Sequence, residues 1–188
     1  RLMCGGVPVD LLPFGEIAEP GTTVSLPGQF RARIKVQGFQ EAFDNAEAMT
    51  LEGVNVKVII PEMLVALKLS SWSHGFHRAK DAMDIRLVLE NVKVLSPNLE
   101  NDFHNEEYGA LLEQFSDDED GLWIATLGSR IQTLLGNSDF SGYLKNLMSS
   151  GPTIGSLVKD MNEGNVPGQE LENALKSLVL PLKAGLTR

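Results

Sequence analysis

The segment 68–85 carries basic and acidic side chains on a stretch that otherwise has the composition of a protein core. Charged side chains are rarely buried unless they pair with each other, bind a metal or contact a ligand. Arginine and lysine donors of this kind are suited to holding a phosphate group. The segment is therefore the first candidate for a functional site. Its charged candidates are Lys68, Arg78, Lys80, Asp81 and Asp84.

The spacing around Asp81 places that aspartate on the apolar side of a predicted helix. Counting from Asp81, the positions i+4, i+7 and i+11 are Ile85, Val88 and Val92, which is the spacing of one helical stripe. Asp81 heads this stripe, and Asp84 flanks it three residues further along. We therefore expect two carboxylates that point toward the interior.

Each of these charges also has a structural interpretation. Asp81 and Asp84 could pair with Lys80, Arg78 or Lys68 and simply hold two helices together. Lys68 could extend from an apolar helix so that its ammonium reaches water. Both interpretations stay open beside the functional one.

Asp10 is a second candidate, since it lies within the apolar run VDLLPF. An aspartate inside a buried strand is costly unless a metal ion or a cation lies beside it. Carboxylate oxygens are ligands that Mg²⁺ prefers. The alternative is a residue at the end of a strand that caps a turn.

The elements that position these residues are predicted to be β-rich over the first sixty residues. Pro61 is a favourable first helical residue, so a helix is predicted to Ser73, and a second one over about 79–92. Gln40–Ala48 is predicted to be a short helix. A hairpin with Glu52-Gly53 at its turn is predicted from Met49–Leu51 and Val54–Ile60. Further candidate strands are Val7–Leu12, Thr22–Leu26 and Arg31–Val36.

After Ser96-Pro97 the pattern becomes helical, with polar loops between the predicted helices. The acidic run 116–120 lacks the ligand spacing of a calcium loop and is predicted to lead into the next helix. The predicted fold is α+β, with an α+β half over residues 1–95 and a helical domain over residues 96–188. The predicted helices cover 106–115, 121–135, 139–149, 154–162 and 169–180.

Composition narrows the classes of function. The net charge of -9 argues against broad binding to nucleic acid, whose phosphates would be repelled. Cys4 is the single cysteine, so no internal disulfide forms and a cytoplasmic location is expected. No apolar run approaches the roughly eighteen residues that span a bilayer, so no membrane association is expected.

Four motifs in order resemble the nucleotidyltransferase-like proteins of the abortive-infection toxin (AbiEii) type. They are VDLLPFG at 9–15, GFQEAFDNA at 38–46, PEMLVALKLSSW at 61–72 and RAKDAMDI at 78–85. The resemblance covers about residues 7–92 and continues weakly through GLWIATLGSRIQTLL at 121–135. It implies a nucleotidyltransferase-like mixed sheet with helices, and Mg-dependent transfer of a nucleotide monophosphate from a nucleoside triphosphate to an acceptor.

The resemblance also implies roles for the candidate residues. Lys68 would contact the nucleotide phosphates, and Asp81, in the KD pair, would be the functional aspartate of the helix. Asp10 would be a metal ligand or base and would match the third carboxylate of the nucleotidyltransferase fold by position. The remaining nucleotide-binding candidates are Arg78, Lys80 and Asp84.

One departure from the family pattern bears on catalysis. The paired D-x-D that holds the metal should precede VDLLPFG, and it is not in this sequence. We expect it in a segment before Arg1; otherwise the chain is a non-catalytic interaction module whose helical half holds a partner. Toxin–antitoxin or phage-defence systems are the implied setting, with an antitoxin protein or an RNA acceptor as the expected partner.

Overall fold

The computed structural model describes residues 2–18, 23–25, 33–74, 79–104, 109–162 and 172–178. The chain divides into two compact units, Arg1–Gln40 and Glu41–Arg188. Across the described residues the fold is mixed α+β, with three separate two-stranded antiparallel sheets and a larger set of helices.

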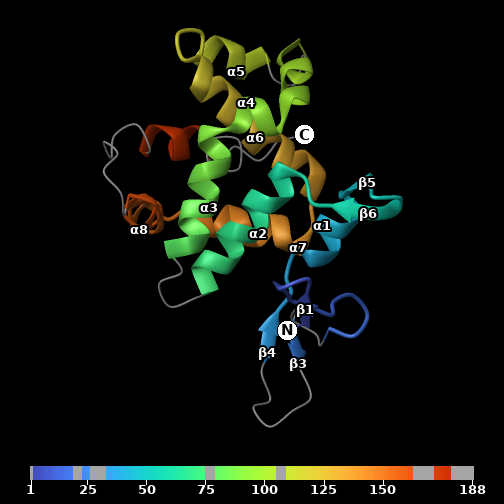
Figure 1. Cartoon of the computed structure of the whole chain (residues 1–188). Helices are drawn as coiled ribbons and strands as arrows, with labels where there is room; N and C mark the ends of the chain where they lie inside the picture. Colours follow the sequence, from blue (N-terminus) through green and yellow to red (C-terminus); the bar gives the residue numbers. More distant parts are fainter. Residues whose placement is uncertain are drawn as a thin grey trace. The chain divides into compact units, whose positions relative to one another are not determined.

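Unit 1 contains two short antiparallel β-pairs (Figure 1). In the first pair, Gly5 and Gly6 make the turn with φ angles of 56° and 83°, a left-handed conformation that glycine adopts without strain. The turn fixes the register, in which Leu2 lies opposite Val9. The strands are β1 (Leu2–Cys4), β2 (Val7–Val9), β3 (Thr23–Ser25) and β4 (Arg33–Lys35).

Each of the three strands predicted for this unit has a counterpart in the structure. The predicted strand Val7–Leu12 is shorter in the structure, where β2 ends at Val9, the residue that pairs with Leu2 of β1. Asp10 therefore follows the strand and is exposed, whereas the sequence places it inside a strand. Its position agrees with the alternative that the sequence left open, a residue at the end of a strand.

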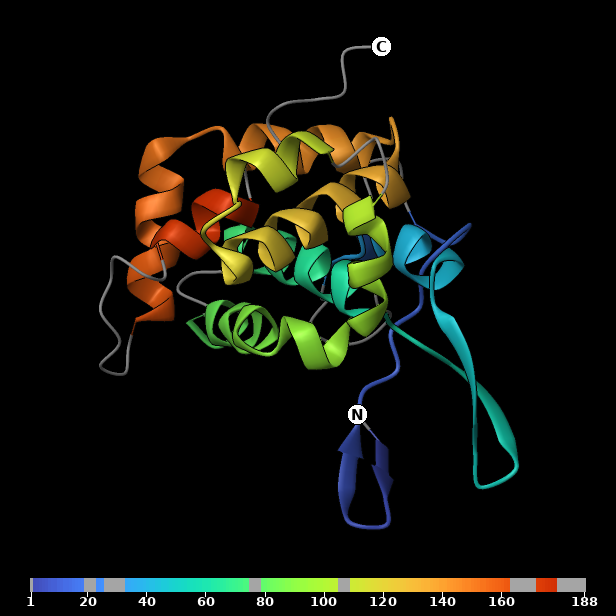
Figure 2. The same cartoon turned by 90° about the horizontal axis from the view of Figure 1, so that it is seen from above.

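Unit 2 begins with the last part of α1 (Phe39–Asp44) and the hairpin of β5 (Glu47–Leu51) and β6 (Val54–Val58). The predicted hairpin is confirmed: Glu52 and Gly53 both have positive φ, 49° and 80°, at its turn. Figure 2 shows this hairpin projecting away from the helices of unit 2. Its strands are mostly exposed along their whole length.

Helices make up the rest of unit 2 (Figures 1 and 2). Serine and aspartate side chains cap three of them, as when Asp118 Oδ1 accepts a hydrogen bond of 2.8 Å from the backbone N–H of Gly121. The helices are α2 (Pro61–His74), α3 (Ala79–Glu90), α4 (Val92–Leu95), the 3₁₀ helix η1 (Pro97–His104), α5 (Gly109–Gln114), α6 (Glu119–Leu135), α7 (Asp139–Met148), α8 (Gly151–Met161) and a last helix over 172–178.

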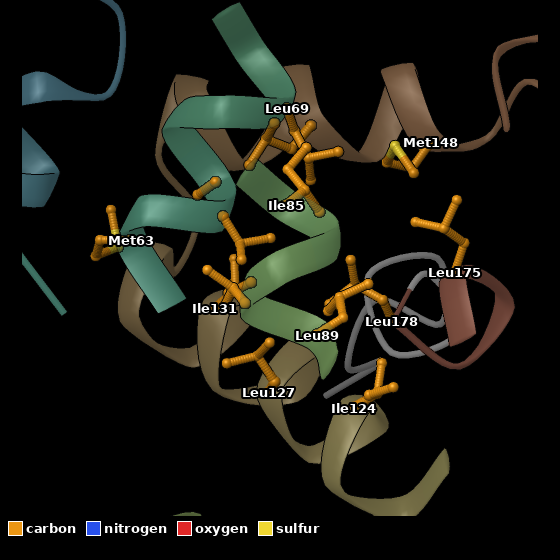
Figure 3. Packing of buried hydrophobic residues seen from close by; sticks show 14 of the residues in the cluster. Met63, Leu69, Ile85, Leu89, Ile124, Leu127, Ile131, Met148, Leu175 and Leu178 are labelled. Atoms are coloured by element: carbon orange, nitrogen blue, oxygen red, sulfur yellow. The ribbon is translucent and has the colours of Figure 1, made fainter. Parts of the chain in front are cut away.

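One apolar core joins these helices, and Figure 3 shows its centre. Leu69 of α2 and Ile85 of α3 are fully buried, as are Leu127 and Ile131 of α6. The last helix adds Leu178, whose backbone carbonyl approaches Gly128 of α6 so closely that a side-chain carbon there would collide with it. Gly128 is required at this contact.

The core crosses the position where the sequence predicts a domain boundary. α2 packs against α6 and α7, and α3 packs against α8, so helices from both sides of residue 95 bury their apolar faces together. The structure therefore divides the chain at Gln40 rather than at residue 95. The composition of the sequence changes at Ser96-Pro97, but the apolar core continues across this point.

Candidate functional site

Adjacent helices α2 and α3 bring three of the predicted site residues into one cluster (Figure 1). The ammonium Nζ of Lys68 donates hydrogen bonds to Asp81 Oδ1 at 3.0 Å and to Asp84 Oδ2 at 2.6 Å. We call these three residues the Lys68 cluster. Its formal charge is −1, from one lysine and two aspartates.

The Lys68 cluster runs from the interior to the surface. The side chain of Asp81 is 4% exposed, that of Lys68 26% and that of Asp84 35%. Asp81 therefore anchors the ammonium from inside, whereas Asp84 holds it where solvent or a ligand reaches it. The arrangement fixes a lysine charge at the surface of unit 2.

The pKa of Lys68 reflects two opposing effects. Burial lowers it, but the hydrogen bonds to Asp84 and Asp81 and the negative charge of both carboxylates outweigh that effect and raise the pKa above its ordinary 10.5. Lys68 therefore stays protonated at neutral pH. It is suited to stabilising negative charge and unsuited to acting as a base.

The prediction that Asp81 heads an apolar stripe is confirmed. Ile85 and Val88 of α3 are buried as Asp81 is, and Val92, which begins the next helix, α4, is buried as well. The pairing with Lys68 is also the helix-to-helix contact that the sequence leaves open as a structural alternative. The same three residues therefore fit both the functional interpretation and the structural one, in which they hold α2 and α3 together.

The structure describes two of the three other predicted site residues. Lys80 is exposed on α3, and Arg78 lies outside the described residues. Asp10 is exposed and belongs to unit 1, so its role as metal ligand or base for a nucleotide held by Lys68 stays a prediction.

The Lys68 cluster does not fit a magnesium ion held by the protein itself. Both of its carboxylates accept from the ammonium of Lys68, which takes the place of a cation. Within the described ranges, no group of three or more His, Cys, Asp and Glu side chains comes together as a metal site. A metal ion at the Lys68 cluster would have to compete with the ammonium for both carboxylates.

A second ionic cluster, which the sequence did not predict, links α2, η1 and α6. Arg130 of α6 lies 3.5 Å from Glu62 Oε1 and 3.1 Å from Asp102 Oδ2. Burial raises the pKa of Glu62 above 4.5, although Arg130 and a backbone hydrogen bond oppose this. Its three members come from segments far apart in sequence, so no local pattern indicates it.

Comparisons with family models, curated proteins and solved structures give no match to this chain. None of the helices in the described part of the chain is long and apolar enough to cross a bilayer. The functional interpretation therefore depends on the motifs of the sequence and on the Lys68 cluster.

Proposed function

We propose that this chain is a nucleotidyltransferase-like protein that binds a nucleoside triphosphate and transfers its nucleotide monophosphate to an acceptor, in a toxin–antitoxin or phage-defence setting. One observation supports the proposal. Lys68, Asp81 and Asp84, to which the family resemblance gives nucleotide roles, form one cluster although the two aspartates are 13 and 16 residues from the lysine.

Binding would use the exposed side of the Lys68 cluster. A phosphate oxygen that approaches from solvent competes with Asp84 for the ammonium, while Asp81 keeps the lysine in place. Because the cluster has a formal charge of −1, it repels a bare triphosphate more strongly than one whose charge is partly neutralised by a bound cation. Mg²⁺ is the proposed cation, with Asp10 as its proposed protein ligand.

In the proposed reaction, an acceptor hydroxyl oxygen attacks the α-phosphorus of the triphosphate. The bond from that phosphorus to the bridging oxygen breaks, and pyrophosphate leaves with the electron pair. The hydroxyl proton passes to a carboxylate, for which Asp10 is the candidate. Lys68 stabilises the negative charge on the phosphates during transfer.

The test is equilibrium binding of labelled nucleoside triphosphates to the natural full-length protein in the presence of Mg²⁺. Lys68→Met removes the ammonium and should weaken binding by about tenfold or more, whereas Lys68→Arg should retain part of it. Lys176→Met is the matched control, because Lys176 also pairs with a carboxylate, Glu172, at 2.7 Å. Urea unfolding of each variant separates loss of binding from loss of the fold.

Two results would count against the proposal. One is a full-length protein that binds no triphosphate; the other is a folded Lys68→Met variant that binds like the parent. Either result would mean that the Lys68 cluster only holds α2 and α3 together. The chain would then be better interpreted as the non-catalytic interaction module.

A further inference from the structure

Unit 2 contains a groove whose lining includes no residue of the Lys68 cluster. Its walls come from the end of α3 with α4, the start of α6 and the last helix over 172–178. Its volume is about 680 Å³, within the range of sites that bind ligands. α4 and α6, labelled next to each other in Figure 1, are in contact.

The floor of the groove is apolar and its rim is acidic. Leu89, Val92 and Ile124 line it and are each at most 6% exposed. Three carboxylates line the groove against a single ammonium, so the formal charge of its lining is −2. These charged residues are Glu90, Asp118, Asp120 and Lys93.

Two cations beside the groove pair with its carboxylates, but they do not balance them: Arg86 Nε lies 2.6 Å from Glu90 Oε1, and Lys93 pairs with two acidic side chains. Lys93 Nζ already pairs with Glu119 Oε1 and Asp120 Oδ1, both at 2.9 Å. Glu119 adds a further carboxylate beside the groove, and its side chain is 74% exposed. The rim therefore attracts positive charge and repels phosphates, nucleic acid and anionic lipid surfaces.

Exposed apolar side chains also lie on α3 and α4, the two helices that contribute to the groove. Val94 lines the groove and is 79% exposed, and Leu87, seven residues before it, is 60% exposed. Met83 precedes Leu87 by one helical turn and is 47% exposed. Large apolar side chains that are exposed in this way are typical of surfaces that contact other proteins.

We propose that this groove is the docking site for a partner protein segment that presents an apolar face flanked by lysine or arginine side chains. Apolar side chains of the segment fill the floor, and its basic side chains lie along the acidic rim, where four carboxylates (Glu90, Asp118, Glu119 and Asp120) face two cations (Arg86 and Lys93). The charge complementarity of rim and segment selects this class of partner. The proposal goes beyond the proposed function and does not depend on nucleotide binding.

The test uses a fluorescent synthetic peptide of about four helical turns, with leucines at helical spacing and lysines elsewhere. We expect saturable binding to the whole chain by anisotropy, with changes in the backbone amide signals of Gly121 and Ile124 in NMR spectra. A peptide with glutamates in place of the lysines should bind at least about tenfold more weakly.

Matched variants locate the binding surface. Val94→Lys should weaken the lysine peptide by about tenfold, because it removes apolar contact and adds like charge. Val54→Lys makes the same change on the exposed β5–β6 hairpin, where Val54 is 62% exposed, and should leave binding unchanged. Lys68→Met should also leave it unchanged, which separates this proposal from nucleotide binding.

Several outcomes would overturn the assignment. They are equal binding of the glutamate peptide, equal weakening by Val94→Lys and Val54→Lys, or no saturable binding at all. Displacement of the lysine peptide by a short RNA at the Gly121 and Ile124 amides would instead assign the groove to nucleic acid.

Discussion

Lys68 and Glu62 lie on the same helix, α2, and burial in the fold has different consequences for their charged forms. Two carboxylates compensate Lys68, and its pKa rises, so the charged form is favoured. Glu62 has a guanidinium 3.5 Å away, yet burial dominates and its pKa also rises, so the neutral form is favoured. The first charge is stabilised by the fold, and the second is a cost to it.

This cost predicts a specific dependence of stability on pH. Because the folded protein holds the Glu62 proton more tightly than the unfolded chain does, the free energy of unfolding falls as pH rises from below 4.5 through the raised pKa. Glu62→Gln removes that dependence. We expect this variant to gain stability relative to the parent between acidic and neutral pH, measured by urea unfolding across that range.

Glu113→Gln is the control for this measurement, because Glu113 is exposed on α5. It should follow the parent at every pH. If Glu62→Gln were instead less stable than the parent at neutral pH, the ion pair with Arg130 would outweigh burial, and the assigned cause of the raised pKa would be wrong.

At the scale of elements, caps and turns define where helices and strands begin and end. Asp118 accepts a hydrogen bond from the Gly121 N–H at the start of α6. Asp118→Ala leaves that donor without its side-chain partner and should cost about 0.5–2 kcal/mol in the free energy of unfolding. Asp117→Ala changes the exposed neighbour and should cost much less, so chemical denaturation of the two variants tests the cap. Equal costs would show that general charge, and not the cap, matters.

Local signals account for the elements that the sequence predicted well. Glu52-Gly53 specifies a hairpin turn and Pro61 a helix start, and both predictions are confirmed. Both depend on a few adjacent residues whose backbone preferences are intrinsic. The end of β2 was predicted too late, because the apolar run continues past Val9, the residue that pairs with Leu2, and the extent of pairing cannot be read from one run of residues.

The candidate site was predictable to the same extent. Helical spacing indicated that Asp81 faces inward, since a period of 3.6 residues can be read directly from the sequence. The choice of Lys68 as its partner could not be read in this way, because it depends on how α2 packs on α3. The same limit applies to Arg130 and to the walls of the groove, which come from segments far apart in the chain.

At the scale of the whole molecule, unit 2 should unfold as one cooperative unit. Trp72 lies on α2 and Trp123 on α6, one on each side of residue 95, and these are the two tryptophans of the chain. Trp72→Phe and Trp123→Phe variants each keep one tryptophan as a fluorescence reporter. We expect their urea-unfolding transitions to be equally steep, and we expect Leu127→Ala to lower the midpoint of both.

The size of that shift follows from the core. Leu127 is fully buried, and its replacement by alanine should cost about 2–5 kcal/mol. If only the Trp123 fluorescence transition moved, residues 96–188 would behave as a separate domain, as the change in composition suggested. If both move together, the core unites the two halves.

The last helix has a consequence for the protein during its synthesis. Leu175 and Leu178 are fully buried, and the Leu178 carbonyl closes against Gly128. A ribosome must therefore deliver residue 178 before the apolar surface between α6 and α8 can be sealed. Until then the nascent chain exposes that surface, and a premature stop a few codons earlier should yield a product that chaperones and proteases recognise.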